Sequence, residues 1–330
     1  MTAIRTILLA TTLLAGPAMA QEFRPAIVYS GGGKFDKSFN ESAYMGAERF
    51  VAETGLTYVD FEPEGDAQIE QALRNYAGQG YSPIVAMSFA AEEAVEVVAE
   101  DYPDIQFVLI DGEVDLPNVR SVAFREHEGS FLAGLMAGMA SQTGTVGFIG
   151  GMDIPLIRRF GCGYKQGVVA ANPDATILES MTGTTDAAWS DPVRGGELAR
   201  IQIDQGADVV YAAAGGTGLG VLQMAHDMGK LSVGVDTNQN YLHPGSVLTS
   251  MVKGVDEAVY DAFIDASQGA FTPGTLNLGV AENGVRVAMD ENNAPLVTDE
   301  MKARLAAAEA AIKDGSLVVH DYMSDNSCPL

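Results

Sequence analysis

The sequence is poor in the residues from which metal centres and nucleophilic active sites are built. Only two cysteines, Cys162 and Cys328, and four scattered histidines occur among the 330 residues. The cysteines lack the spacing of a metal site or a redox motif, and no Gly-x-Ser-x-Gly segment is present. We therefore expect no metal, no cofactor and no enzymatic activity. In an oxidising compartment the two cysteines could form a disulfide, or both could stay free.

Basic charge is scarce as well. Lys and Arg total 19 against 44 Asp and Glu, which gives a formal net charge of −25. A surface of this sign repels nucleic-acid phosphates and anionic lipids, and no basic face is visible along the chain. Nucleic acid is therefore not expected as a partner, and we interpret the acidity as a property that keeps the protein soluble.

Long apolar runs are also missing. The apolar stretch from Ile7 to Leu14 is too short to span a bilayer, and it lies between Arg5 and Ala18-Met19-Ala20. This order is typical of a cleavable signal peptide over residues 1–20. Because Gln21 stands where a lipid-anchored protein would carry cysteine, we expect no lipid anchor and no direct membrane insertion. The expected location is the periplasm.

What remains is longer than a single hydrophobic core usually fills, so two lobes are expected. The predicted strands are Ala26–Tyr29, Thr57–Phe61, Pro83–Met87, Gln106–Ile110, Val119–Ala123, Thr145–Ile149, Thr176–Ser180, Val209–Ala213, Ser232–Val235, Val247–Ser250, Thr275–Val280 and Val285–Met289. The predicted helices are Ser38–Thr54, Asp66–Gln79, Ala90–Asp101, Gly129–Gln142, Arg158–Ala171, Asp191–Asp204, Gly218–Met228 and Gly254–Ala266. Alternation of this kind predicts an α/β fold with doubly wound parallel sheets.

We divide the chain into two lobes at the changes in this pattern. Residues 21–125 plus 241–273 are predicted to form the first lobe, and residues 126–240 plus 274–330 the second. Short returning segments in the last third of the chain indicate that it crosses between the lobes more than once.

The most informative segment runs from Gly31 to Asn40 and directly follows the predicted strand Ala26–Tyr29. Open α/β folds bind small molecules at the carboxyl edge of the sheet, where such strands end. These ten residues supply glycines, aromatic rings, a carboxylate, ammonium groups and an amide. The segment therefore predicts a loop that holds a small ligand.

The residues from Asp36 to Ala43, D-K-S-F-N-E-S-A, resemble the D-K-S-F-N-x-S signature of the basic membrane protein family, which comprises ABC-transporter substrate-binding proteins of the purine-nucleoside-binding type. The resemblance continues through Val108–Asp111, Phe131–Gly134, Gly150–Pro155, Ser190–Pro192, Ala213–Gly218, Gly234–Asp236 and Ser250–Lys253. It implies a type I periplasmic-binding-protein fold, with three crossovers at the hinge and a ligand cleft between the lobes. It also implies delivery of a captured nucleoside to the permease and ATPase subunits of an ABC importer. We expect a monomer.

Aromatic side chains hold a flat base by stacking. The resemblance implies that Trp189, the only tryptophan, stacks on the base, and we predict that Phe35 covers its opposite face. Either ring could instead serve in packing, and Phe39 is expected in the core. The resemblance implies that Asp111 accepts a hydrogen bond from a purine N–H, unless it caps a turn. Asn40 can donate to and accept from a base edge, or serve only at a helix start.

The sugar requires different chemistry. A carboxylate such as Asp236 can accept from both hydroxyls of a ribose, and Lys253 can donate to ribose oxygens while offsetting that charge. The two could also form a plain salt bridge. Gly215 and Gly216 would let the backbone approach the sugar closely. Asp36 is assigned to the ligand as well, although it could only cap the following helix.

Other ligands and functions stay open. The same fold could bind a free purine base, riboflavin or a sugar-like signal molecule, and a nucleoside hydrolase or a structural surface protein is a more distant alternative. Trp189 stands where the family more often has phenylalanine, which leaves the choice between purine and pyrimidine open.

Overall fold

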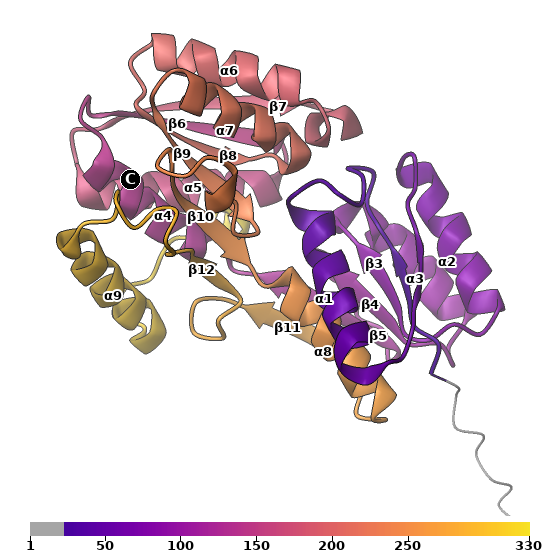
Figure 1. Ribbon diagram of the computed structural model, residues 1–330. Helices are drawn as coiled ribbons and strands as arrows, with labels where there is room; N and C mark the ends of the chain where they lie inside the picture. The colour runs from indigo at the N-terminus through magenta and orange to yellow at the C-terminus, as the bar shows by residue number, and fades with distance from the viewer. Residues whose placement is uncertain (1–22) are drawn as a thin grey trace, which may run out of the picture.

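The computed structural model describes residues 23–330, so the predicted signal peptide and Gln21 lie outside the described residues. Two six-stranded sheets form the framework (Figure 1). The first has the order β11 (Gly274–Leu278), β5 (Val119–Phe124), β4 (Phe107–Ile110), β3 (Ile84–Met87), β1 (Ala26–Val28), β2 (Val59–Phe61). The second has the order β12 (Val285–Val287), β10 (Val247–Lys253), β9 (Leu231–Asp236), β8 (Val209–Ala213), β6 (Thr145–Met152), β7 (Thr176–Gly183). All neighbours are parallel except β10 and β12.

Helices cover both faces of each sheet, which confirms the predicted α/β fold. Those of the first lobe are α1 (Phe39–Thr54) and α8 (Val255–Ser267) on one face, and α2 (Ile69–Gly78) and α3 (Glu92–Asp101) on the other. Those of the second lobe are α4 (Glu126–Ala140) and α5 (Pro155–Ala171) on one face, and α6 (Pro192–Asp204) and α7 (Gly218–Asp227) on the other.

Strand β1 shows why a central strand of such a sheet is apolar along its whole length. Ile27 packs in the cluster that contains α1 and α8, whereas Ala26 and Val28 pack in the cluster that contains α2 and α3. Since successive side chains point to opposite faces and both faces are buried, no position on the strand favours a polar residue.

The chain passes between the lobes three times: from β5 into α4, from β10 into α8, and from β11 towards β12. This differs from the predicted boundaries. Strand β10, placed by the sequence in the first lobe, pairs with β9 of the second sheet. Strand β11, placed in the second lobe, pairs with β5 of the first sheet. The reason is that strand pairing joins residues far apart in the chain, and an apolar segment does not reveal which sheet it completes.

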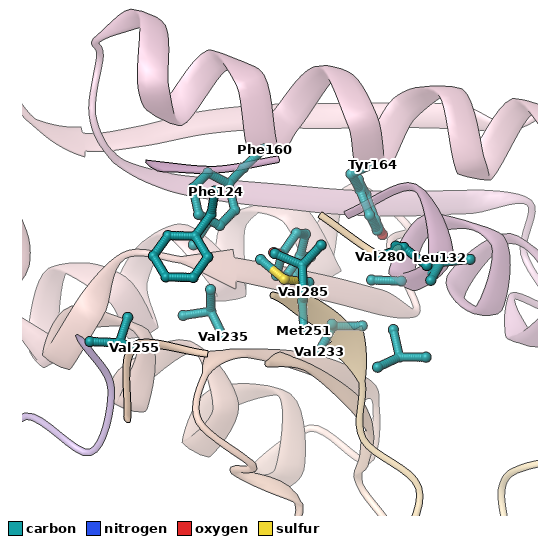
Figure 2. Close-up of a cluster of buried hydrophobic side chains, with 14 of the residues drawn as sticks. Phe124, Leu132, Phe160, Tyr164, Val233, Val235, Met251, Val255, Val280 and Val285 are labelled. Atoms are coloured by element: carbon teal, nitrogen blue, oxygen red, sulfur yellow. The ribbon is translucent and has the colours of Figure 1, made fainter. Parts of the chain in front are cut away.

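The crossover segments are anchored in a hydrophobic cluster of the second lobe (Figure 2). Phe160 and Tyr164 of α5 lie on one side of this cluster, and valines of β9 and Met251 of β10 lie on the other. Phe124, at the end of β5, and Val255, at the start of α8, belong to the same cluster. The ends of β5 and β10 are therefore held by packing at the point where the chain leaves each lobe.

The C-terminal part adds a helix that the sequence prediction omitted, α9 (Asp299–Asp314). The Thr298 hydroxyl accepts from the Met301 amide at 3.1 Å, which caps its first turn, and Gly315 ends it in the left-handed conformation. Buried Met301 and Leu305 pack this helix onto the core near α4.

The two cysteines are joined in the structure. Cys162 of α5 and Cys328 form a disulfide with a Cα–Cα distance of 5.6 Å, which ties the C-terminal tail to the second lobe. Within residues 23–330, no helix is both long enough and apolar enough to cross a membrane.

Candidate functional site

A cavity lies between the lobes, beyond the carboxyl ends of β1, β3, β4, β8, β9 and β10. Its lining comprises Ser30, Gly31, Gly32, Asp36, Phe39, Asp66, Ser88, Phe89, Ala90, Asp111, Leu156, Ile157, Phe160, Asp186, Trp189, Ala213, Ala214, Gly215, Val235, Asp236 and Lys253. Six of the eight predicted ligand residues are in this lining, and Phe35 and Asn40 are not. Parallel α/β sheets bind ligands at this edge, so the cavity is the candidate site.

The two phenylalanines of the glycine-rich segment differ in their relation to the cavity, and Phe39 also packs against the core as expected. Phe35 is 63% exposed, and its ring meets that of Tyr44 edge-on at a centroid distance of 5.3 Å. Phe39, which we expected in the core, lines the cavity. Lys34, next to Phe35 in the chain, pairs with Asp60. Phe39 follows at the first position of α1, where the helix faces the cleft.

Asn40 holds the loop together. Its amide nitrogen donates to the carbonyl oxygens of Ser30 and Gly33, at 3.3 and 3.0 Å. Its amide oxygen accepts from the Ser30 amide and hydroxyl, at 3.2 and 3.1 Å. The prediction that Asn40 contacts the ligand is therefore not supported, since these protein contacts use both ends of its side chain.

Asp36 both caps a helix and lines the cavity. Its carboxylate accepts from the backbone amides of Ser38, Asn40 and Glu41 at 2.8, 3.1 and 3.1 Å. Burial raises the pKa of Asp36 to about 7, although these amides favour the ionised form. The capping alternative from the sequence is thus present, together with the predicted place in the cavity.

Trp189 lies at the end of a one-turn helix, η3 (Asp186–Trp189), in the second lobe. Its ring covers Gly151 so closely that a Cβ there would lie 2.0 Å from a ring carbon. Gly215, with φ of 55°, approaches the Trp189 backbone, since a Cβ on it would lie 3.4 Å from the carbonyl oxygen. These glycines give the ring its position beside the cavity.

Lys253 supplies the positive charge at the inner end of the cavity, which is the buried end formed by Asp111, Asp236 and Lys253. Its ammonium donates to Asp111 and lies 3.4 Å from a Glu126 oxygen. It also lies over three aromatic rings, those of Phe39, Phe124 and Phe160, at centroid distances of 4.9, 5.2 and 5.5 Å. Burial alone would lower the pKa of Lys253, but Asp111, Glu126 and Asp236 raise it, so the group stays charged.

The ion pair differs from the predicted one. The sequence suggested Asp236 as the partner of Lys253, but Asp236 accepts from the hydroxyl of Ser38 in the first lobe, and Asp111 takes the lysine. Asp111 and Asp236 follow or end their strands with positive φ, 65° and 64°. Burial raises the pKa of Asp236, and Lys253 and the Ser38 hydrogen bond partly offset this. Strained backbone of this kind is concentrated at functional sites.

One acceptor in the cavity has no protein partner. The side chain of Asp111 is 7% exposed, its Oδ2 accepts from Lys253, and its Oδ1 has no hydrogen-bond partner among the described residues. A buried oxygen left in this state is costly, so the cavity is suited to a ligand that donates a hydrogen bond there.

The family model for ABC transporter substrate-binding proteins that are PnrA-like, the Bmp family, matches residues 26–320. The chain belongs to the Bmp family. A relative from Lactococcus lactis subsp. cremoris, the ABC transporter nucleoside-binding protein BmpA, is 30% identical over 323 residues, covering 90% of this chain and 89% of that protein. A solute-binding protein of an ABC transporter system from Aeropyrum pernix K1 superposes with a TM-score of 0.84 at 27% identity, covering 91% and 94%. These matches confirm the family inferred from the motifs.

Some relatives of this chain are named lipoproteins. One from Pyrococcus abyssi, 34% identical over 283 residues that cover 81% of this chain and 69% of the relative, is named an uncharacterized lipoprotein. Here position 21 is glutamine, which is why the sequence predicted no lipid anchor. That prediction concerns residues outside those described.

The sequence analysis of this Bmp protein missed a buried carboxylate. Glu126, at the start of α4, is fully buried and lies 3.1 Å from Arg159 as well as near Lys253. Arg159 also pairs with Asp321 of the tail at 2.6 Å. The polar segment Arg125-Glu126-His127-Glu128 directly before an apolar helical run was the available signal. Through Arg159, Glu126 links the charges of the cavity to Asp321 of the C-terminal tail.

Proposed function

We propose that this protein captures a nucleoside, most favourably a purine nucleoside, for an ABC importer. The observation that carries the proposal is the division of one cavity into two chemically different parts. Phe39 and Trp189 provide aromatic surface, and Asp111, Asp236 and Lys253 provide charged groups at the inner end. A nucleoside has the same division, because it joins a flat base to a sugar with several hydroxyls.

The aromatic part suits the base. Stacking on an aromatic side chain contributes about 1–3 kcal/mol per base. Trp189 belongs to the second lobe and Phe39 to the first, so both would meet a ligand only when the lobes are closed around it. Phe39 replaces Phe35 in this role, since Phe35 faces solvent.

The charged part suits the ribose. Asp236 can accept from a hydroxyl, and Lys253 can donate to a hydroxyl oxygen. The unpaired Oδ1 of Asp111, which the resemblance assigned to a purine N–H, offers a second acceptor for the ribose instead, because Asp111 lies beside Lys253. Gly215 exposes backbone beside these groups, where a side chain would occupy space. A free base would leave these acceptors without partners, and this favours the nucleoside over the bare base.

Transport follows from closure. The ligand binds to one lobe, the second lobe closes over it, and the closed form docks on the permease and ATPase subunits. Export through the predicted signal peptide would place this step in the periplasm. The name of the lactococcal relative, a nucleoside-binding protein, supports this ligand class.

Isothermal titration calorimetry on ligand-stripped protein tests the proposal. Adenosine, guanosine, inosine, cytidine, uridine, adenine, ribose and riboflavin form the panel. We expect purine nucleosides to bind at micromolar concentration or tighter, and ribose and free bases much more weakly. Asp236→Asn should abolish this binding, whereas Asp115→Asn, at an exposed position, should not.

Other outcomes of the panel have distinct meanings. Tight binding of adenine or riboflavin without nucleoside binding would replace the proposed ligand and keep the transport role. Release of free base during the titration, followed by chromatography, would indicate a hydrolase. If no member of the panel binds, nucleosides are ruled out as the ligand. The molecule that co-purifies with the protein would then have to be identified.

A further inference from the structure

Two carboxylates at the rim of the cavity were not among the predicted site residues. Asp66 begins the one-turn helix η1 (Asp66–Gln68) of the first lobe, and Asp186 begins η3 of the second. Both line the cavity and are half-buried, whereas Asp236 and Lys253 are buried at the inner end. The rim and the inner end therefore both carry negative charge.

The rim carboxylates come from opposite lobes and meet across the opening. A Cβ on Gly65, the residue before Asp66, would lie 3.9 Å from Asp186 Oδ2, so the Asp186 carboxylate lies beside the start of η1. Burial, and then the charge of Asp186, raise the pKa of Asp66 to about 6. Two carboxylates of like charge repel one another in a partly buried site, and this repulsion opposes the approach of the two lobes.

Protein groups do not relieve this repulsion. Lys253 is the one basic side chain among the described residues that line the cavity, and its ammonium is already bound to Asp111. The Asp111 Oδ1 atom, buried and without a partner, independently shows that the cavity is rich in acceptors and short of donors. A ligand that fits must therefore bring N–H or O–H groups to more than one place.

The rim donors would come from the base. Asp186 and Trp189 belong to the same helical turn, so a base stacked on Trp189 presents an edge near Asp186. Glycine backbone borders both carboxylates, because a Cβ on Gly31 would lie 3.9 Å from Asp66 Oδ1, and one on Gly65 would lie 3.9 Å from Asp186 Oδ2. Hydrogen bonds from N–H groups to a carboxylate are among the stronger ones in proteins.

We propose that Asp66 and Asp186 together select the base, favouring purines whose outer edge carries N–H donors. Adenine offers an amino group, and guanine offers a ring N–H beside an amino group. A base without such donors would leave two charges facing each other without partners. This inference rests on the proposed function, because it requires a base at the Trp189 end of the cavity.

Calorimetry with a graded set of ribosides at pH 7.5 tests the inference. Guanosine, adenosine, inosine and purine riboside share the sugar, and purine riboside has no N–H on its base. The wild-type protein should bind guanosine and adenosine at least about tenfold more tightly than purine riboside, with inosine between them. Asp66→Asn and Asp186→Asn should each reduce this ratio to within about threefold.

Glu64→Gln is the matched control. It removes one negative charge two residues from Asp66, at an exposed position outside the cavity lining, and should keep the wild-type ratio. Thermal unfolding of each variant confirms that it folds. Equal affinities for all four ribosides in the wild type, or an unchanged ratio in both aspartate variants, would overturn the inference and leave nucleoside binding intact. If none of the four binds, the proposed function fails and the inference fails with it.

Discussion

Lys253, the last residue of β10 in the second lobe, donates to the carboxylate of Asp111, which follows β4 in the first lobe. A second bond joins the lobes in the opposite sense, from the Ser38 hydroxyl to Asp236. Both contacts lie at the inner end of the cavity. The same charged groups that we assign to ligand binding therefore also hold the closed conformation.

Replacing Lys253 should cost stability as well as binding. In Lys253→Met the carboxylates of Asp111 and Glu126 lose a buried cation, and breaking a buried pair from one side costs about 3–5 kcal/mol. Urea denaturation measures this change in the free energy of unfolding. Lys302→Met, on the exposed side of α9, is the control and should change it little. A loss below about 1 kcal/mol in Lys253→Met would show that the pair is not important for stability.

The two phenylalanines of the loop should behave differently. Phe39→Ala should weaken purine-nucleoside binding by about tenfold or more, because the ring lines the cavity. Phe35→Ala should leave affinity unchanged, because that ring contacts Tyr44 at the surface. Calorimetry on both variants decides between them. The opposite result would return the stacking role to Phe35.

Trp189 offers a direct optical test. It is the only tryptophan, so intrinsic fluorescence reports on this one side chain. Saturating purine nucleoside should change the emission, and Trp189→Ala should weaken binding by at least about tenfold, with Trp189→Phe close to the wild type. Emission that is insensitive to a ligand shown by calorimetry to bind would place the base elsewhere.

The disulfide should contribute to stability. Cys162 and Cys328 are 166 residues apart, and closing so long a loop stabilises by up to about 4–5 kcal/mol on the chain-entropy estimate. Reduction should therefore lower the melting temperature of the wild type. The double variant Cys162→Ser, Cys328→Ser should melt at that lower temperature with or without reductant. A wild type that melts identically under both conditions would show that the bond is absent in solution.

His127 should make the protein less stable in acid. Burial lowers the pKa of His127 to about 4, against about 6.5 in an unfolded chain. Between these values the unfolded state binds more protons, so stability falls as the pH is lowered from about 6.5 towards 4, by roughly 2–3 kcal/mol. His127→Gln should reduce this loss, seen by comparing urea denaturation at pH 7 and pH 5. An equal loss in the variant would assign the acid sensitivity to other groups.

Local patterns identified much of the framework and part of the site. Each predicted helix corresponds to one of α1 to α8, because helical period and apolar strands are properties of neighbouring residues. Asp111, Asp236 and Lys253 were predicted as site residues because polar side chains at the ends of apolar strands meet at one sheet edge.

The failures involve residues whose roles depend on distant partners. Glu126 was missed because its importance comes from Lys253 and Arg159, both far along the chain. Phe35 was predicted in the cavity lining but is exposed, and Phe39 packs against the core as expected while also lining the cavity, because the loop that carries them is placed by tertiary contacts. Asn40 was assigned to the ligand because an amide at a helix start does not reveal that its hydrogen bonds are already used by the preceding loop.

The sequence by itself determined the α/β class, the family and the set of strand ends that form the site, since each is written in local pattern or in ordered motifs. Only the tertiary structure decided which sheet β10 and β11 complete, which carboxylate binds Lys253, and that Asp66 and Asp186 line one cavity from opposite lobes. The physical reason is that contacts between the lobes bring together residues from separate crossovers, and their geometry is fixed by packing rather than by neighbouring sequence.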